Sequence, residues 1–190
     1  PLLRSGAETG DHLVVSGTLG AAAWACQELY RKKTPHQSAL NELLRPQPRL
    51  ALGQALSSGL NGVKATAAMD LSDGLVTDVE HLLSASSART STKLGVDIQL
   101  ASLPTLAAMH SLSEAVRWPL QLGGGDDYEL LFTLSDAAIN QLPALSQAID
   151  LPLTVIGRIN AQPGIRCWQP DGRLLTAAKT GYEHFKENPR

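Results

Sequence analysis

Hydrophobic residues along this chain fall into short apolar runs separated by turn residues, a pattern that predicts several buried β-strands. Runs of about four to eight apolar or β-branched residues, bounded by glycine, proline or polar residues, are typical of strands. Such runs predict a strand and its closing turn at residues 12–20. They predict further strands at residues 65–71, 95–100, 128–134 and 153–159. Residues 164–177 predict a hairpin, because "PDG" separates two β-rich stretches.

The segments between these runs have the hydrophobic periodicity of α-helices. This periodicity predicts helices at residues 21–33, 44–59, 72–87 and 135–149. In the first helix, Trp24, Leu29 and the alanines are expected to face the interior, and the basic end suits the helix dipole. Two prolines precede the second helix, and Pro143 is expected to interrupt the fourth.

The third predicted helix is amphipathic. Its apolar residues recur with the spacing i, i+1, i+4, i+7 and i+8. They are Leu75, Val76, Val79, Leu82 and Leu83. Strands and helices thus mix along the chain without a regular strand–helix–strand repeat, an internal repeat or a long linker. We therefore expect an α/β (α+β) fold in which helices pack on a mixed β-sheet.

Composition and charge narrow the class of protein. The 190 residues are 43% hydrophobic and 18% charged, as in a globular domain, and the net charge of -2 gives no reason to expect nucleic-acid binding. No run of about 18 apolar residues predicts a membrane span. Cys26 and Cys167 are too few for a disulfide framework, so we expect a reducing, cytoplasmic setting with both thiols buried. The chain opens without methionine, and we expect that the N-terminal part of a longer protein precedes it.

The first candidate for chemistry is "DLSDG", between a predicted strand and a predicted helix. Asp70 and Asp73 flank Ser72 in this turn, where a helix start offers free N–H groups. Carboxylates suit Mg²⁺, and the hydroxyl and N–H groups suit phosphate. The alternative is a helix cap, which serine and aspartate also favour. Asp78, one turn further along, is expected to be a solvated surface residue.

The second candidate is "GGGDDYEL". Three glycines permit a close approach of the backbone, and two adjacent aspartates point in different directions. Asp126 and Asp127 are therefore candidates for one ligand contact and one contact that holds the loop. The alternative is a flexible turn with local side-chain hydrogen bonds.

The other sequence features give weaker indications of function, or their absence excludes a class of site. Arg4 could bind a phosphate through two donors, although an arginine near a chain end indicates little by itself. The aromatic pair in "TGYEHF" could pack the last segment down or stack on a ring. The sequence contains neither a P-loop nor a G-x-S-x-G elbow, and its five histidines form no zinc pattern.

Six segments together resemble the thiamine-monophosphate kinase family, in the family's order. They are "LRSGAETGDHLVVSGTLG", "RPQPRLALGQAL", "MDLSDGLVTDVEHL", "GGGDDYELLFT", "LPLTVIGRI" and "GYEHF". The wider relatives are enzymes similar to aminoimidazole-ribonucleotide synthetase. The resemblance implies that residues 1–190 are the C-terminal domain of that fold. Residues 1–20 would be the closing segment at the junction with an absent N-terminal domain, which carries an acidic "GDDA"-type metal loop.

The resemblance also implies an activity: transfer of a phosphoryl group from ATP to thiamine monophosphate, with Mg²⁺, by a homodimer. By position, Asp70 and Asp73 would be Mg²⁺ ligands, and Ser72 and Arg4 would contact ATP. Transfer would be direct and in line, because the acceptor is an already ionised phosphate oxygen. We expect little kinase activity from this chain alone.

Two further residues would contact the substrate. Asp126 stands where the family usually has Glu in "GGEDYEL", which shortens that side chain by one methylene, and Tyr182 would lie at the thiamine end. Two alternatives stay open. One is another ATP-dependent enzyme of the same fold, and the other is a non-catalytic member that binds nucleotides or protein partners.

Overall fold

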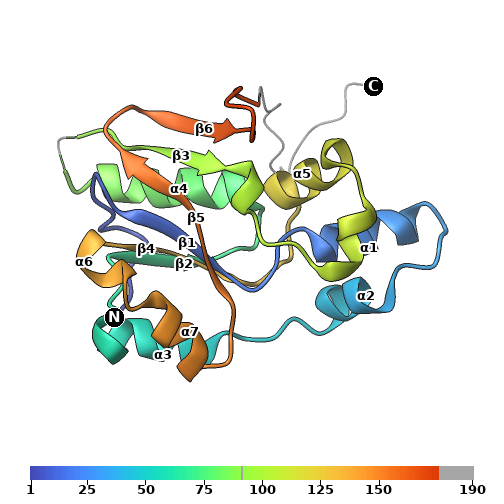
Figure 1. Ribbon diagram of the computed structural model, residues 1–190, viewed down its shortest axis with the longest axis horizontal. Helices are drawn as coiled ribbons and strands as arrows, with labels where there is room; N and C mark the ends of the chain where they lie inside the picture. Colours follow the sequence, from blue (N-terminus) through green and yellow to red (C-terminus); the bar gives the residue numbers. More distant parts are fainter. Residues whose placement is uncertain (91, 176–190) are drawn as a thin grey trace.

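The computed structural model describes residues 1–90 and 92–175, which fold around one mixed sheet (Figure 1). Its order is β2-β4-β1-β5-β3-β6. The strands are β1 (His12–Ser16), β2 (Ala67–Asp70), β3 (Gly95–Gln99), β4 (Leu130–Leu134), β5 (Leu153–Asn160) and β6 (Gly164–Trp168). All neighbours pair antiparallel except β3 and β6, which are parallel. The predicted mixed sheet is therefore confirmed.

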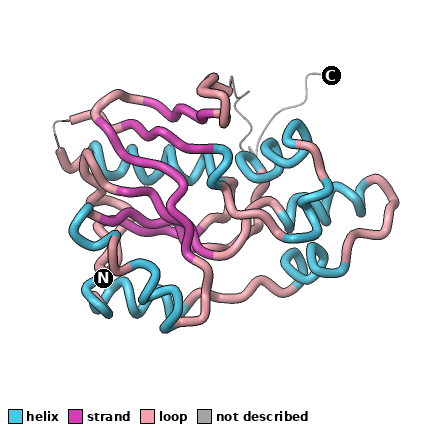
Figure 2. Tube along the Cα trace, viewed as in Figure 1, coloured by secondary structure: helices cyan, strands magenta, loops and turns pink. Residues whose placement is uncertain are grey.

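Seven α-helices lie in the described residues, and most connect the strands (Figure 2). They are α1 (Ala21–Tyr30), α2 (Gln37–Leu44), α3 (Leu50–Ser58), α4 (Leu75–Ser87), α5 (Glu114–Gly123), α6 (Asp136–Ile139) and α7 (Leu142–Ala148). Short 3₁₀ turns occur at Leu60–Gly62, Leu100–Ser102 and Ala107–Ser111. Helices α1 and α2 pack on each other at one end of the molecule (Figure 1).

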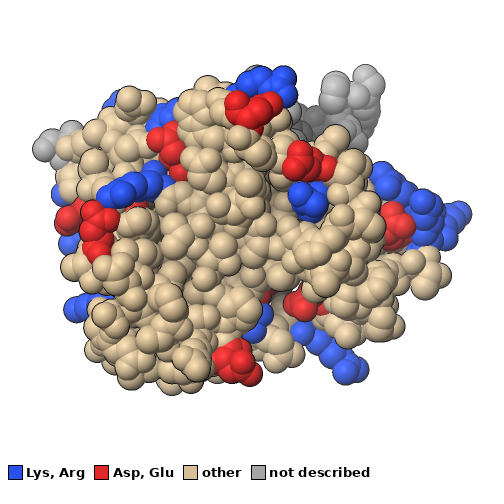
Figure 3. Space-filling view, viewed as in Figure 1, with Lys and Arg blue, Asp and Glu red and all other residues tan. Residues whose placement is uncertain are grey.

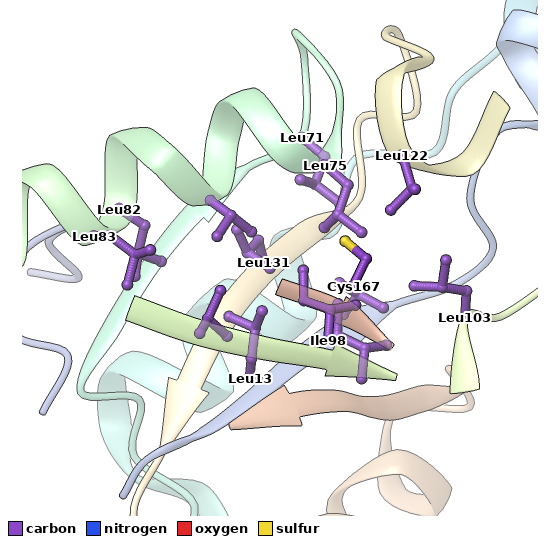
Figure 4. Close-up of a cluster of buried hydrophobic side chains, with 14 of the residues drawn as sticks. Leu13, Leu71, Leu75, Leu82, Leu83, Ile98, Leu103, Leu122, Leu131 and Cys167 are labelled. Carbon is purple, nitrogen blue, oxygen red and sulfur yellow. The ribbon is translucent and has the colours of Figure 1, made fainter. Parts of the chain in front are cut away.

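Helices cover both faces of the sheet, so its central strands are buried on both sides. On one face, Leu75 and Leu82 of α4 pack with Leu13 of β1 and Leu131 of β4 (Figure 4). On the other face, side chains of α3, α6 and α7 pack with Val14 and Phe132. Leu13, Val14 and Val15 are all fully buried, which explains why this strand is an unbroken apolar run. Burial of these side chains supplies most of the driving force for the fold.

Several predicted elements need correction. Helices α2 and α5 were not predicted; α5 contains Pro119 and runs into the glycine-rich segment. The fourth predicted helix is two helices, and the break precedes Pro143, which lies in the first turn of α7. The hairpin at 164–177 is present as β6, a turn and a single bridge from Trp168 to Leu174, with residues 176 and 177 outside the described part.

Two predicted burials are wrong. Leu29 is half exposed at the end of α1, because the interior face of this helix is its alanines. Cys26 is exposed, whereas Cys167 is buried and its burial raises the thiol pKa to about 11. No helix of the described residues combines the length and the apolar character that crossing a bilayer requires. Charged side chains lie mostly toward the margins of the face seen in Figure 3, around a broad uncharged area.

Candidate functional site

The turn between β2 and α4 carries Asp70, Ser72 and Asp73. Asp70 is exposed at the end of β2, and Ser72 and Asp73 are partly exposed. The alternative of a side-chain helix cap in this turn is not borne out: Gly74 is the residue that precedes α4, and none of the described side chains caps the helix. In the described part of the chain neither Asp70 nor Asp73 has a hydrogen-bonded side-chain partner, so both carboxylates are available to a ligand.

Asp78 organises this turn, and its predicted place on the solvated surface is wrong. Its side chain is 1% exposed. One carboxylate oxygen accepts hydrogen bonds from the backbone N–H of Ser72 at 3.0 Å and of Asp73 at 3.1 Å. Burial raises the pKa of Asp78, and the N–H donors oppose that shift. These two N–H groups are therefore already satisfied, which leaves the hydroxyl of Ser72 as the donor that this residue could give to a ligand.

The glycine-rich segment packs directly on this turn. The backbone N–H of Asp126 donates to the Ser72 carbonyl at 3.0 Å, and that of Tyr128 donates to the Leu71 carbonyl at 2.8 Å. A Cβ on Gly125 would lie 2.7 Å from the Ser72 carbonyl oxygen, so only glycine fits there. The segment is thus a fixed loop, and the alternative of a flexible turn is not borne out.

Successive side chains of this loop alternate between the surface and the interior of the protein. Asp126 and Tyr128 are exposed, whereas Asp127 is partly buried and Glu129 is 3% exposed. Asp126 and Tyr128 both have positive φ, at 66° and 49°. Such a backbone is uncommon for residues other than glycine, and it is found where the surrounding structure holds it in place.

Asp127 fixes the loop to the start of α1, as expected of one of the two aspartates. Its two carboxylate oxygens accept the Gly20 N–H at 3.0 and 2.9 Å. Burial, only partly offset by this donor, raises the pKa of Asp127 to about 8. The acid is therefore held in a place that favours its protonated form.

Glu129 fixes the loop on the other side, and sequence reasoning missed it. Its carboxylate accepts a hydrogen bond from the Ser16 hydroxyl at the end of β1 and one from the Arg49 Nε at 2.7 Å. The hydrogen bond with Glu129 raises the pKa of Arg49. An acid directly before an apolar strand indicates that it has a polar or cationic partner, but the sequence does not identify Arg49, which lies 80 residues away.

Two cavities open on either side of Tyr128. The larger, about 790 Å³, is mostly apolar and is lined by the segment before α3, by α3 itself and by Asp70. The second, about 680 Å³, is lined by α1, the glycines 123–125, Ser72, Asp73 and Asp126. Tyr128 lines both cavities. The three candidate carboxylates therefore lie around one aromatic side chain, with a cavity on each side.

The acids around Tyr128 also act on its phenol. The pKa of the Tyr128 phenol is raised, chiefly by the negative charge of Asp126 and further by Asp70 and Asp73. A cation would relieve this repulsion, and carboxylate oxygens are ligands that Mg²⁺ prefers. Among residues 1–90 and 92–175, however, no group of three or more acids, histidines or cysteines is arranged to hold a metal ion.

Two predicted site residues, Arg4 and Tyr182, are not among these groups. Arg4 is exposed and lines neither cavity; its neighbour Leu3 accepts a hydrogen bond from the Ala68 N–H of β2. Tyr182 lies outside the described residues. The structure thus brings together Asp70, Ser72, Asp73 and Asp126, and it adds Tyr128 to them.

Known proteins share both this sequence and this fold. The chain is 36% identical to the thiamine-monophosphate kinase of Escherichia coli O157:H7 over 97% of its own length and 55% of that protein. It is 32% identical to that of Haemophilus influenzae Rd over 98% of its length and 56% of that protein. No protein-family model matches the chain. The chain spans about half the length of the curated relatives it matches.

Solved structures of thiamine-monophosphate kinases are also similar to this chain. The thiamine-monophosphate kinase of Stenotrophomonas maltophilia K279a superposes with a TM-score of 0.76 at 35% identity, over 92% of this chain and 54% of that one. A structure of AaThiL complexed with AMPPCP and TMP gives a TM-score of 0.73 at 29% identity, over 97% of this chain and 54% of that one.

The hydrogenase maturation protein HypE of E. coli, at 22% identity and a TM-score of 0.70, shares the fold alone. The expected fold, that of enzymes similar to aminoimidazole-ribonucleotide synthetase, is thereby confirmed. Over nearly its whole length, this chain is a relative of the thiamine-monophosphate kinases and corresponds to about half of such a protein.

Proposed function

We propose that this chain is the C-terminal domain, residues 1–190, of an enzyme that transfers a phosphoryl group from ATP to thiamine monophosphate and forms thiamine diphosphate. The relatives named thiamine-monophosphate kinase support the activity, and the AaThiL complex with AMPPCP and TMP supports the two substrates. The homodimer and the role of residues 1–20 as a junction rest on the sequence resemblance, and the cytoplasmic location rests on the small number of cysteines.

The observation that carries the proposal is the group of three carboxylates around Tyr128, between two cavities. Asp70 faces the larger cavity, and Asp73 and Asp126 face the smaller one. Two substrates that both carry phosphate need a place where their charged ends meet. A site between two cavities, lined by acids that attract a cation, provides it.

The chain's own residues would hold and orient the reactants. Asp70 and Asp73 would hold Mg²⁺, which neutralises phosphate charge during transfer. The Ser72 hydroxyl would donate to a phosphate of ATP, with Arg4 as a second contact, and Asp126 and Tyr182 would contact thiamine monophosphate. No general base is required, because the acceptor oxygen is ionised near neutral pH, so transfer would be direct and in line.

The proposal is tested in the full-length natural protein that carries this sequence. Thiamine diphosphate formation from ATP and thiamine monophosphate is measured with and without Mg²⁺. Asp73→Asn should reduce turnover by at least about a hundredfold, because the metal ligand is lost, while thermal unfolding stays unchanged. The matched control is Asp171→Asn, an exposed acid in the 170–172 turn, which should leave turnover intact. A wild-type protein that folds but forms no thiamine diphosphate would refute the proposal.

A further inference from the structure

The ion pair between Arg49 and Glu129 stands directly behind the proposed site. Glu129 follows Tyr128 in the loop, and its carboxylate is enclosed by Arg49, by the Ser16 hydroxyl and by Gly17. A Cβ on Gly17 would lie 1.8 Å from a Glu129 oxygen, so the Glu129 carboxylate packs directly against the backbone at Gly17. Glu129 is 3% exposed, and a buried carboxylate without its cation would be strongly destabilised.

Arg49 connects this carboxylate to the wall of the larger cavity. It is the residue that immediately precedes α3, and its side chain is only 20% exposed. Arg49 lines the larger cavity together with Asp70 and Tyr128. Its guanidinium uses two nitrogens on the two oxygens of Glu129, a planar pairing that fixes orientation as well as distance.

The same Ser16 hydroxyl that donates to Glu129 accepts the Leu130 N–H at 2.9 Å. Strand β1, the first residues of β4 and the start of α3 therefore meet at one carboxylate. A displacement of Glu129 would be transmitted to Tyr128, its neighbour in the chain, whose positive φ makes it dependent on its surroundings.

We propose that Arg49 and Glu129 are positioning residues: their pairing locks the start of α3 to the loop and thereby holds Tyr128 between the two cavities. The expected change in kcat rests on the proposed function. The fixed position of the loop can be measured without any enzyme activity. Neither residue touches the reactants in this proposal.

The test compares Arg49→Lys with Arg166→Lys in the full-length protein. Lysine keeps the charge and loses the planar pairing. Arg166 is a matched control, because its side chain is also 20% exposed and pairs with Asp97 at 2.7 Å, on β6 and β3. Amide hydrogen exchange is followed at Asp126 and Tyr128, and kcat and KM are measured for ATP and thiamine monophosphate.

We expect exchange at the two loop amides to rise about tenfold or more in Arg49→Lys and to stay at the wild-type rate in Arg166→Lys. We expect kcat to fall on the order of tenfold in Arg49→Lys alone, since misplaced groups slow transfer more than they weaken binding. Glu129→Gln, which keeps the shape of the side chain, should accelerate loop exchange in the same way.

Equal exchange at the loop in Arg49→Lys and the wild type would overturn the positioning role. So would a loss of thermal stability in Arg49→Lys with unchanged exchange and unchanged kcat. If the wild-type protein forms no thiamine diphosphate, the proposed function fails, and the exchange rates alone decide whether the pair positions the loop.

Discussion

Asp78 and Ser72 are joined by a hydrogen bond of 3.0 Å, from the backbone N–H of Ser72 to the buried carboxylate of Asp78. The same oxygen accepts the N–H of Asp73. An acid in the first turn of α4 thus shapes the turn before the helix, while Asp70 and Asp73 make no side-chain hydrogen bond to any residue that the structure describes. The structural carboxylate and the candidate ligand carboxylates are separate residues.

Asp78→Ala should lower the free energy of unfolding by about 1–3 kcal/mol, because the partly buried N–H groups of Ser72 and Asp73 lose their acceptor. Urea denaturation measures the effect. Glu80→Ala is the control, since Glu80 is exposed on the same helix and should change stability by less than about 0.5 kcal/mol. Equal effects of the two substitutions would contradict the role assigned to Asp78.

The protonation of Asp127 should make stability depend on pH. Its pKa rises from an ordinary value of 3.8 to about 8 in the fold, so between these values the folded state holds a proton that the unfolded state releases. The stabilisation from this bound proton is fully present below the pKa of Asp127 in the unfolded chain. It is lost as the pH rises through the pKa of Asp127 in the folded protein. Asp127→Asn should remove that pH dependence. The measurement is urea denaturation of both proteins from pH 5 to pH 8, and parallel curves would contradict the raised pKa.

The phenol of Tyr128 should report a cation at the site. Its pKa is raised first by Asp126 and further by Asp70 and Asp73, so Asp126→Asn should lower it. Saturating Mg²⁺ should also lower it in the wild-type protein, because the cation offsets the same charges. NMR titration of the tyrosine ring carbons follows the change. If Mg²⁺ leaves the Tyr128 pKa unchanged, the metal site is not beside these three acids.

Gly17→Ala should destabilise the protein more than Gly172→Ala. Both glycines have positive φ, at 59° and 81°, so both substitutions strain the backbone. At Gly17 the new Cβ would overlap a buried side chain, Glu129, whereas at Gly172 no atom of the described residues lies within 4 Å of it. We expect losses of about 3 kcal/mol or more and about 1 kcal/mol, respectively, by thermal unfolding. Similar losses would mean that Glu129 can move aside.

Periodicity predicted the elements whose burial is one-sided or complete. The spacing of Leu75, Val79 and Leu82 predicted α4, and all three are buried. The same spacing contained the signal for Asp78: it lies three residues after Leu75 and four before Leu82, so it shares their buried face. An acid at that position indicates a hydrogen-bonded interior carboxylate.

Long-range pairing limits what sequence can predict at the site. The resemblance located Asp70, Asp73 and Asp126, and the fold brings them together around Tyr128. It did not reveal Arg49 or Gly20, because each joins the loop through a contact that only the folded sheet creates. Helix α5 was missed since Pro119 and three glycines disfavour a helix locally, while burial of Trp118 and Leu122 favours it.

The position of β1 has a consequence for synthesis of the protein. It precedes β2 and β3 in the sequence, yet its two neighbours in the sheet are the later strands β4 and β5. A ribosome must therefore add more than a hundred residues, to Leu130 and beyond, before β1 meets either partner. Until then the apolar residues Leu13, Val14 and Val15 lack both neighbouring strands, and the unpaired edges of β1 are open to association with other chains.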